Sequence, residues 1–248
     1  SIEGITAEML YDCHRAFYCP ANMVLCVVGD VDAEEVCAIA GEASQTGRSS
    51  LPLRDYGAKE TMTPLCARVE RRMEVSMPTF SVGFKCPSPE KGLETMRREI
   101  IGDLAAEILI GESSPLYQSL YEDGLIDAEF SAGYESVKDA CLFSAGGDSK
   151  DPEAVLAALL DEAERIEREG FDPALFDRLK KSALGRRTRD LDSFESICYR
   201  ICAYHFDGAD YFRFPEAYAS VTPEDVKTFL RETVRPERAA MSVVRPKE

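Results

Sequence analysis

The sequence predicts an α+β protein, with an antiparallel or mixed sheet that carries its helices on one face. Two observations support this class. The candidate strands come in pairs, at 66–75 with 79–86 and at 128–135 with 140–147. The candidate helices are grouped between and after these pairs instead of alternating singly with strands, which is typical of α+β folds. The chain has 248 residues, of which 45% are hydrophobic, enough for a substantial core.

The N-terminal part of the chain predicts a helix, a strand and a second helix. Thr6 can cap a helix that Pro20 ends. The uninterrupted apolar run at 22–28 predicts a buried strand, and an acidic helix follows over 32–44. Residues 46–64 are rich in Gly, Ser and Pro and show no periodicity, so they are interpreted as a linker.

The rest of the chain, residues 65–248, predicts one complete domain. Apolar residues at intervals of three and four predict a long helix over 93–110. A short helix is expected from Tyr117 to Tyr121. Beyond the second strand pair the elements expected are helices at 152–169, 173–191, 193–206 and 222–233 and a strand at 239–244.

An internal repeat joins the two ends of the chain. Residues 5–28 align without a gap on residues 221–244, and both copies read as helix, proline and apolar strand. One interpretation is that any helix–proline–strand unit looks like this. The other is that residues 1–45 are the last part of a preceding domain similar to 65–248. The repeat would then have a period of about 216 residues, which is the offset of the alignment.

The charge and cysteine content exclude several classes of protein. The chain carries 29 Lys and Arg against 45 Asp and Glu, a net charge of −16, so nucleic acid and anionic membrane surfaces would repel it. No apolar run approaches the length of a membrane span. The nine cysteines are an odd number without the spacing of a small secreted domain, which favours reduced thiols and a cytoplasmic location.

Two motifs resemble the insulinase-type (pitrilysin family) zinc peptidases. The first comprises Tyr18-Cys19-Pro20-Ala21-Asn22-Met23 followed by Gly29-Asp30-Val31-Asp32. The second is the segment Gly111–Glu135, which is most similar to a bacterial group of processing proteases in that family. The resemblance covers essentially the whole chain. It implies two similar α+β halves that close around a peptide, with this chain as the C-terminal, non-catalytic part.

The resemblance also implies that the zinc of the full-length protein lies in the other half. That half carries His-x-x-Glu-His on a helix, where two imidazoles bind zinc and the glutamate acts as base. This chain has only two histidines, His14 and His205, and neither lies in such a motif. On the matching helix, Asp103 and Glu107 occupy the histidine positions and Ala106 that of the base. No cofactor is expected in this chain. The interpretation favoured for the two carboxylates is a solvated helix face, and the chain alone is not expected to cleave peptides.

Four residues are candidates for contact with a peptide substrate. Tyr121 occupies the position at which active relatives carry an arginine, so that family role is not transferred to it. Residues 128–135 could add a strand to an extended peptide, and alternation places Phe130, Ala132 and Tyr134 on one face.

Two further groups of residues stand out. Cys198, Cys202 and His205 are spaced to share one helix face and are weak candidates for a metal site, with core packing the alternative.

Six basic residues follow one another without an acid between them; they are Arg178, Lys180, Lys181, Arg186, Arg187 and Arg189. This basic run could be a positive surface that attracts an acidic partner. The alternative is a solvated helix face that balances the acids of the preceding helix.

The sequence therefore predicts a non-catalytic C-terminal domain that forms a wall of the substrate chamber in an insulinase-like peptidase. Its expected partners are a catalytic half or peptidase subunit and a peptide. The alternative is a stand-alone scaffold or peptide-binding subunit without a hydrolytic role. The apolar run at 22–28, if left without its own sheet, is an association hazard, so a homodimer is a further possibility.

Overall fold

The computed structural model describes residues 2–44, 51, 53–137 and 140–247. The strands are β1 (Arg68–Met73), β2 (Thr79–Cys86), β3 (Ser131–Val137), β4 (Ala140–Asp148) and β5 (Ala239–Pro246). The helices are α1 (Ala7–Phe17), α2 (Ala33–Ser44), α3 (Leu93–Ile110), α4 (Pro115–Glu122), α5 (Pro152–Glu169), α6 (Pro173–Arg189), α7 (Phe194–Phe206), α8 (Phe214–Ser220) and α9 (Pro223–Thr233).

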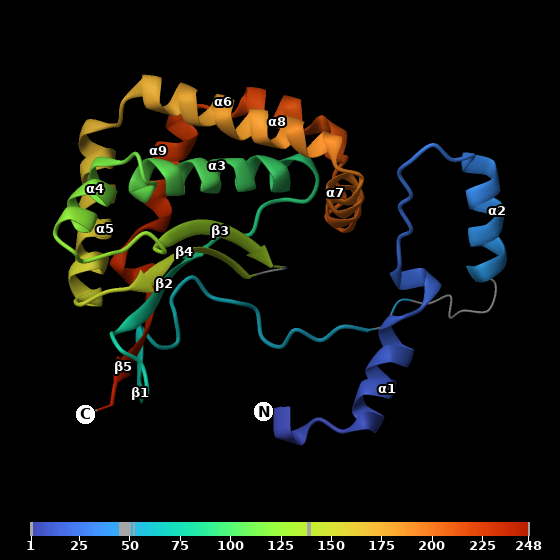
Figure 1. Ribbon diagram of the computed structural model, residues 1–248, viewed down its shortest axis with the longest axis horizontal. Helices are drawn as coiled ribbons and strands as arrows, with labels where there is room; N and C mark the ends of the chain where they lie inside the picture. The colour runs from blue at the N-terminus through green and yellow to red at the C-terminus, as the bar shows by residue number, and fades with distance from the viewer. Residues whose placement is uncertain (1, 45–50, 52, 138–139, 248) are drawn as a thin grey trace.

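The strands form one mixed sheet in the order β1-β5-β2-β4-β3. β5 pairs parallel with β1 and antiparallel with β2, and the remaining pairs are antiparallel. Helices α3, α5 and α9 lie on one face of this sheet, and α6 and α8 lie over α3 (Figure 1). The predicted α+β class, with a mixed sheet covered by helices on one face, is confirmed.

The core lies between the sheet and its helices. Phe84 and Phe143, from the neighbouring strands β2 and β4, are fully buried toward the helical layer. Phe229 of α9 packs edge-on against Phe143 and Tyr134, with ring centroids 5.8 and 5.9 Å apart. Such aromatic contacts add to the stabilisation from burial alone. Gly102 lets α3 approach β3 closely, since a Cβ there would lie 2.4 Å from that of Tyr134.

The N-terminal segment, residues 2–44, lies to one side of this body (Figure 1). The predicted strand at 22–28 is wrong, because the segment is extended but pairs with no strand in the described part of the chain. Met23 and Leu25 are exposed, whereas Cys26 is half-buried and its carbonyl accepts a hydrogen bond from Cys198 of α7. The apolar run is thus present without the neighbouring strand that it needs within the described residues.

The two copies of the proposed repeat have the same local conformation. Helices α1 and α9 begin and end at equivalent positions, and each is followed by a 3-10 turn at the proline, Pro20–Asn22 and Pro236–Arg238. Thr6 and Thr222 cap them in the same way, with backbone angles of −100°, 160° and −117°, 162°. A common origin of the two segments stays a prediction.

Several bounds differ by a few residues from the sequence-based expectation, and one helix was missed. β3 begins at Ser131 instead of residue 128, because Asp127 accepts the backbone N–H groups of Glu129 and Phe130 in a turn. Helix α8 was not predicted; its buried residues, Phe214, Ala217 and Tyr218, form only a single turn of periodic pattern. No helix in the described part of the chain is long and apolar enough to cross a bilayer.

Candidate functional site

A cleft of about 560 Å³ opens where α3, α4, α6 and the start of β3 meet. Its wall on α3 carries Asp103 and Glu107, and the turn after α3 adds Glu112. Tyr117 of α4 and Arg186 of α6 lie on other sides. The lining also includes Phe130, Ser131 and Ala132 from the approach to β3 and its first residues. The helix that the resemblance matches to the zinc-binding helix of the catalytic half therefore forms one wall of this cleft.

The amphipathic pattern of α3 explains why its two carboxylates line the cleft. Leu104 and Ile108 are buried in the core, while Asp103 and Glu107 lie one turn apart on another face. Ala106, between the two carboxylates, is 5% exposed. Asp103 is exposed and Glu107 half-buried, so the interpretation of a solvated helix face is compatible with the structure, which adds that this face borders a concave surface shared with α6 and β3.

Asp103 has an unusual electrostatic environment. Loss of surrounding water in the concavity raises the pKa of its carboxyl to about 6, and the nearby Glu99 adds to the shift, although solvent still reaches the side chain. The guanidinium groups of Arg187, Arg200 and Arg186 oppose it. The charge of Asp103 therefore changes near neutral pH, at the wall of the cleft.

A hydrogen-bonded chain lies behind this wall. Arg187 of α6 is 8% exposed and donates from Nη1 to Tyr204 Oη at 3.2 Å, and Tyr204 donates in turn to Glu99 Oε2. Burial raises the pKa of Glu99, opposed by this hydrogen bond and by Arg187. A buried charge is tolerated only when it is paired in this way. These hydrogen bonds therefore hold α6 and α7 against α3.

The structure separates the four predicted substrate-contacting residues. Phe130 and Ala132 line the cleft. Tyr121 is 52% exposed beyond it and stacks on Tyr117, which does line it, with ring centroids 6.0 Å apart. Tyr134 is buried between α3 and Phe229, so its ring contributes to packing. Substrate contact by the first three residues stays a prediction.

The donors in the cleft do not fit a hydrolytic zinc site. Asp103 and Glu107 offer two carboxylates without an imidazole, and Ala106 cannot act as a base. In the described part of the chain, no group of three or more His, Cys, Asp or Glu side chains is placed to hold a metal ion. The weak candidate Cys198, Cys202 and His205 is therefore not supported. His205 is exposed, whereas both cysteines are half-buried.

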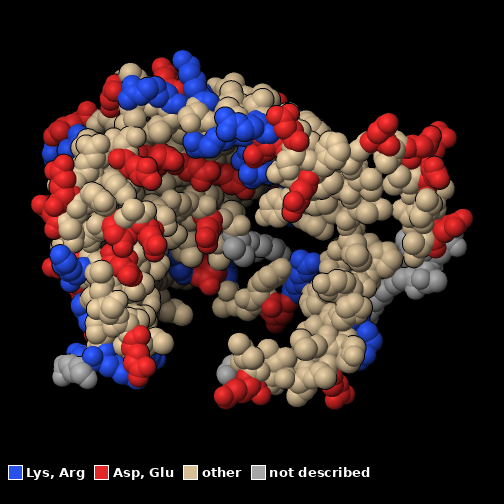
Figure 2. Space-filling model, in the orientation of Figure 1, with Lys and Arg blue, Asp and Glu red and all other residues tan. Residues whose placement is uncertain are grey.

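The basic run on α6 does not act as a unit. Arg187 is buried, Lys180 donates to the carbonyl of Val221 at 2.7 Å, and Arg186 lines the cleft. Lys and Arg side chains still gather over α6 (Figure 2), where Arg178, Lys181 and Arg189 are exposed. The acids of α5 form ion pairs with Arg165, Arg168 and Arg235, and a balance between the basic run and those acids at longer range stays a prediction.

A mixed sheet covered by helices on one face is the fold expected for the non-catalytic domains of insulinase-like peptidases. A family model described as the peptidase M16 inactive domain matches residues 4–183, and the chain belongs to this family. The chain is 31% identical over 256 residues to a Bacillus subtilis (strain 168) protein named uncharacterized zinc protease YmfH. That alignment covers all of this chain and 58% of the relative.

Solved structures show the same fold. An M16-like peptidase from Alicyclobacillus acidocaldarius superposes with a TM-score of 0.86 at 26% identity, over 99% of this chain and 59% of that one. A peptidase M16 inactive domain from Pseudomonas fluorescens gives 0.81 at 17% identity, over 100% and 59%. The chain thus spans somewhat more than half the length of these relatives. The predicted resemblance to insulinase-type zinc peptidases is confirmed.

Proposed function

We propose that this chain forms one wall of a peptide-binding chamber, whose zinc site is carried by a catalytic His-x-x-Glu-His half. The observation that carries the proposal is the cleft beside the start of β3, on the helix that corresponds to the zinc-binding helix. The cleft has the size of an ordinary ligand site, and polar groups converge on it from α3 and α6.

The free edge of β3 suits an extended peptide. β3 pairs only with β4 within the described part of the chain and carries a single charged residue, Glu135. β1, at the opposite edge, has the sequence RVERRM and is exposed throughout. Charged side chains on an edge discourage strand addition. A peptide that adds a strand to the sheet would therefore pair with β3. The side chains of the peptide would then lie beside the cleft at Ser131 and Ala132.

The N-terminal segment supports the presence of a covering half. Leu10 of α1 is 61% exposed, whereas the equivalent residue of α9, Val226, is fully buried. Phe17, Met23 and Leu25 are exposed as well. An apolar surface of this kind on an otherwise acidic segment indicates an interaction site. The catalytic half is the proposed occupant, and a second copy of this chain is the alternative that a measurement of solution mass distinguishes.

The test uses the full two-half protein with an extended fluorescent peptide. A large side chain in the cleft, Ala132→Trp, should weaken peptide binding about tenfold or more, a loss of at least about 1.4 kcal/mol. The matched control is Ala157→Trp, on an exposed position of α5 outside the cleft. That variant should bind as the wild type does.

A second experiment leaves the protein unchanged. The same peptide, N-methylated at alternate amides, cannot donate to the edge of β3 and should bind more weakly than the parent peptide. Equal binding by both peptides, together with an unaffected Ala132→Trp variant, would refute the chamber-wall role. It would favour the scaffold alternative, in which the domain assembles with a partner but does not touch the peptide.

A further inference from the structure

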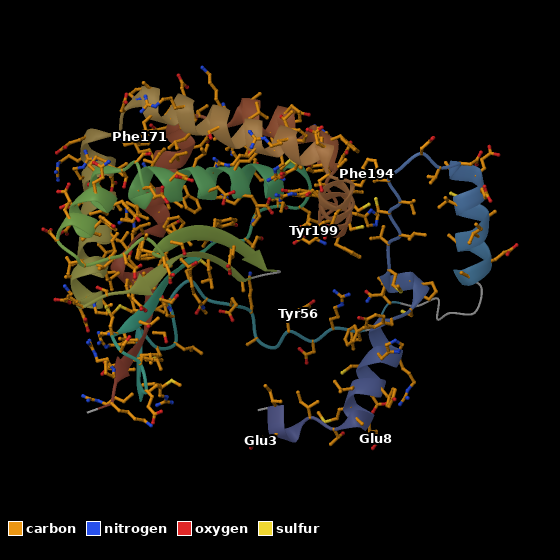
Figure 3. All side chains as sticks on the ribbon, in the orientation of Figure 1. Glu3, Glu8, Tyr56, Phe171, Phe194 and Tyr199 are labelled. Carbon is orange, nitrogen blue, oxygen red and sulfur yellow. The ribbon has the colours of Figure 1, made fainter. Side chains whose placement is uncertain are left out.

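Three thiols from distant parts of the chain meet where the N-terminal segment touches α7. Cys26 lies in the extended stretch after α1, and Cys198 and Cys202 lie one turn apart on α7. Cys198 Sγ donates to the carbonyl oxygen of Cys26 at 3.8 Å, and both α7 thiols lie close enough to influence the Cys26 thiol. Figure 1 shows this stretch running beside α7, and Figure 3 labels Phe194 and Tyr199 on the same helix.

The degree of burial distinguishes these three thiols from the other cysteines. Cys26, Cys198 and Cys202 are half-buried, so a small oxidant can reach them while their geometry stays defined. The remaining cysteines are either exposed and isolated from this contact or buried; the exposed ones are Cys13, Cys37 and Cys66. Burial and the neighbouring α7 thiols raise the pKa of Cys26, which keeps it a neutral thiol at rest.

We propose that Cys26 and the α7 thiol pair are an oxidisable site, at which Cys26 forms a disulfide with Cys198 or, by exchange, with Cys202. The oxidant class is a small soluble disulfide such as glutathione disulfide. Because the Cys198 thiol already touches the backbone of Cys26, only a modest movement is needed to reach disulfide geometry. The third thiol, one helical turn away, can attack the new bond and move it between the two α7 positions.

The chemistry is balanced by the oxidant. A cysteine thiolate attacks one sulfur of the small disulfide, forms a mixed disulfide and releases one small thiol. The partner cysteine then displaces the second small thiol and closes the Cys26–Cys198 bond. The two cysteines lose two electrons and two protons together, and the small disulfide gains both as two free thiols.

The bond would join segments 172 residues apart in the sequence. If the proposed function is correct, the N-terminal segment belongs to the catalytic half, and the disulfide links the two halves independently of residues 46–64. An oxidised chamber would then open less readily, because a flexible connection between halves is what permits closure and opening.

The test follows the thiols directly. The reduced chain is incubated with glutathione disulfide, its free thiols are alkylated, and its peptides are mapped by mass spectrometry without reduction. We expect a peptide joining Cys26 to Cys198 or Cys202, in a chain that remains monomeric on a non-reducing gel. We also expect loss of alkylation at Cys26, which dithiothreitol restores.

Two variants serve as controls. Cys26→Ser changes a residue outside any helix or strand, so the fold should persist, and the crosslink to α7 should disappear. Cys13→Ser, at an exposed position of α1, should leave the crosslink unchanged. A Cys26 that carries only a mixed disulfide with glutathione, or that pairs with Cys13, Cys37 or Cys66, would overturn the proposal. The readout does not depend on peptide binding, so failure of the chamber role would leave this result intact.

Discussion

Replacement of Gly102 by alanine tests how closely α3 packs on the sheet. A Cβ at this position would lie 2.4 Å from Tyr134 Cβ and 2.5 Å from Tyr134 Cγ. Neither neighbour is the far end of a flexible side chain, because the Cβ position follows the backbone of β3. Overpacking of this kind costs about 1–3 kcal/mol. Alanine gains about 1 kcal/mol over glycine in a helix, so the expected net loss of stability is about 0–2 kcal/mol.

Gly185 provides the matched control. It also lies inside a long helix, α6, but a Cβ there meets no atom within 4 Å. Gly185→Ala should therefore stabilise the protein by about 0.5–1 kcal/mol. Urea unfolding followed by circular dichroism measures both changes, since the transition midpoint shifts with stability at constant slope. If Gly102→Ala were as stabilising as Gly185→Ala, the close approach of α3 to β3 described above would be wrong.

Three further variants probe the core, the cleft and the sheet edge. Phe229→Ala should destabilise the fold by about 3–5 kcal/mol in the same urea assay, because it empties a fully buried site; a loss below 1 kcal/mol would contradict the core assignment. Asp103→Asn should raise the melting temperature above pH 6 but not below pH 4, since the folded-state pKa of about 6 exceeds the ordinary aspartate value of 3.8. An equal effect at both pH values would exclude this cause. Glu153→Gln should cost about 0.5–1 kcal/mol at pH 7. Hydrogen bonds from Arg68 and Arg245 lower the pKa of Glu153 to about 2 from 4.5, so the loss should fade as the pH falls between these values.

The sequence predicts helices well where the apolar spacing is long and regular. Residues 93–110 are the clearest example, since buried residues recur along α3 and the predicted bounds match the structure. The error at 22–28 has a different origin. Its apolar run is genuine, but no strand that pairs with it lies among the described residues, and the run itself does not show which strand would lie beside it.

The cleft was predicted less completely than the fold. Phe130 and Ala132 were identified from strand alternation, but the same alternation included Tyr134, which packs beneath α3. Asp103 and Glu107 were noticed through the family motif, yet their concave surroundings depend on Arg186, which lies far along the chain. The run of bases on α6 was the one signal for this contact, since it includes Arg186. The contact between Cys26 and α7 crosses 172 residues and had no sequence signal.

The order of the strands has a consequence for the making of the protein. β5, the last strand of the described chain, lies between β1 and β2, so the sheet is incomplete until residues 239–246 have been synthesised. During translation β1 has no strand to pair with and β2 has one unpaired edge. Both pair fully only after the C-terminal strand β5 has been made. Contacts of such long sequence separation form slowly. Loss of even the final strand would therefore divide the sheet rather than trim it, and premature termination near the C-terminus would expose two strand edges to aggregation.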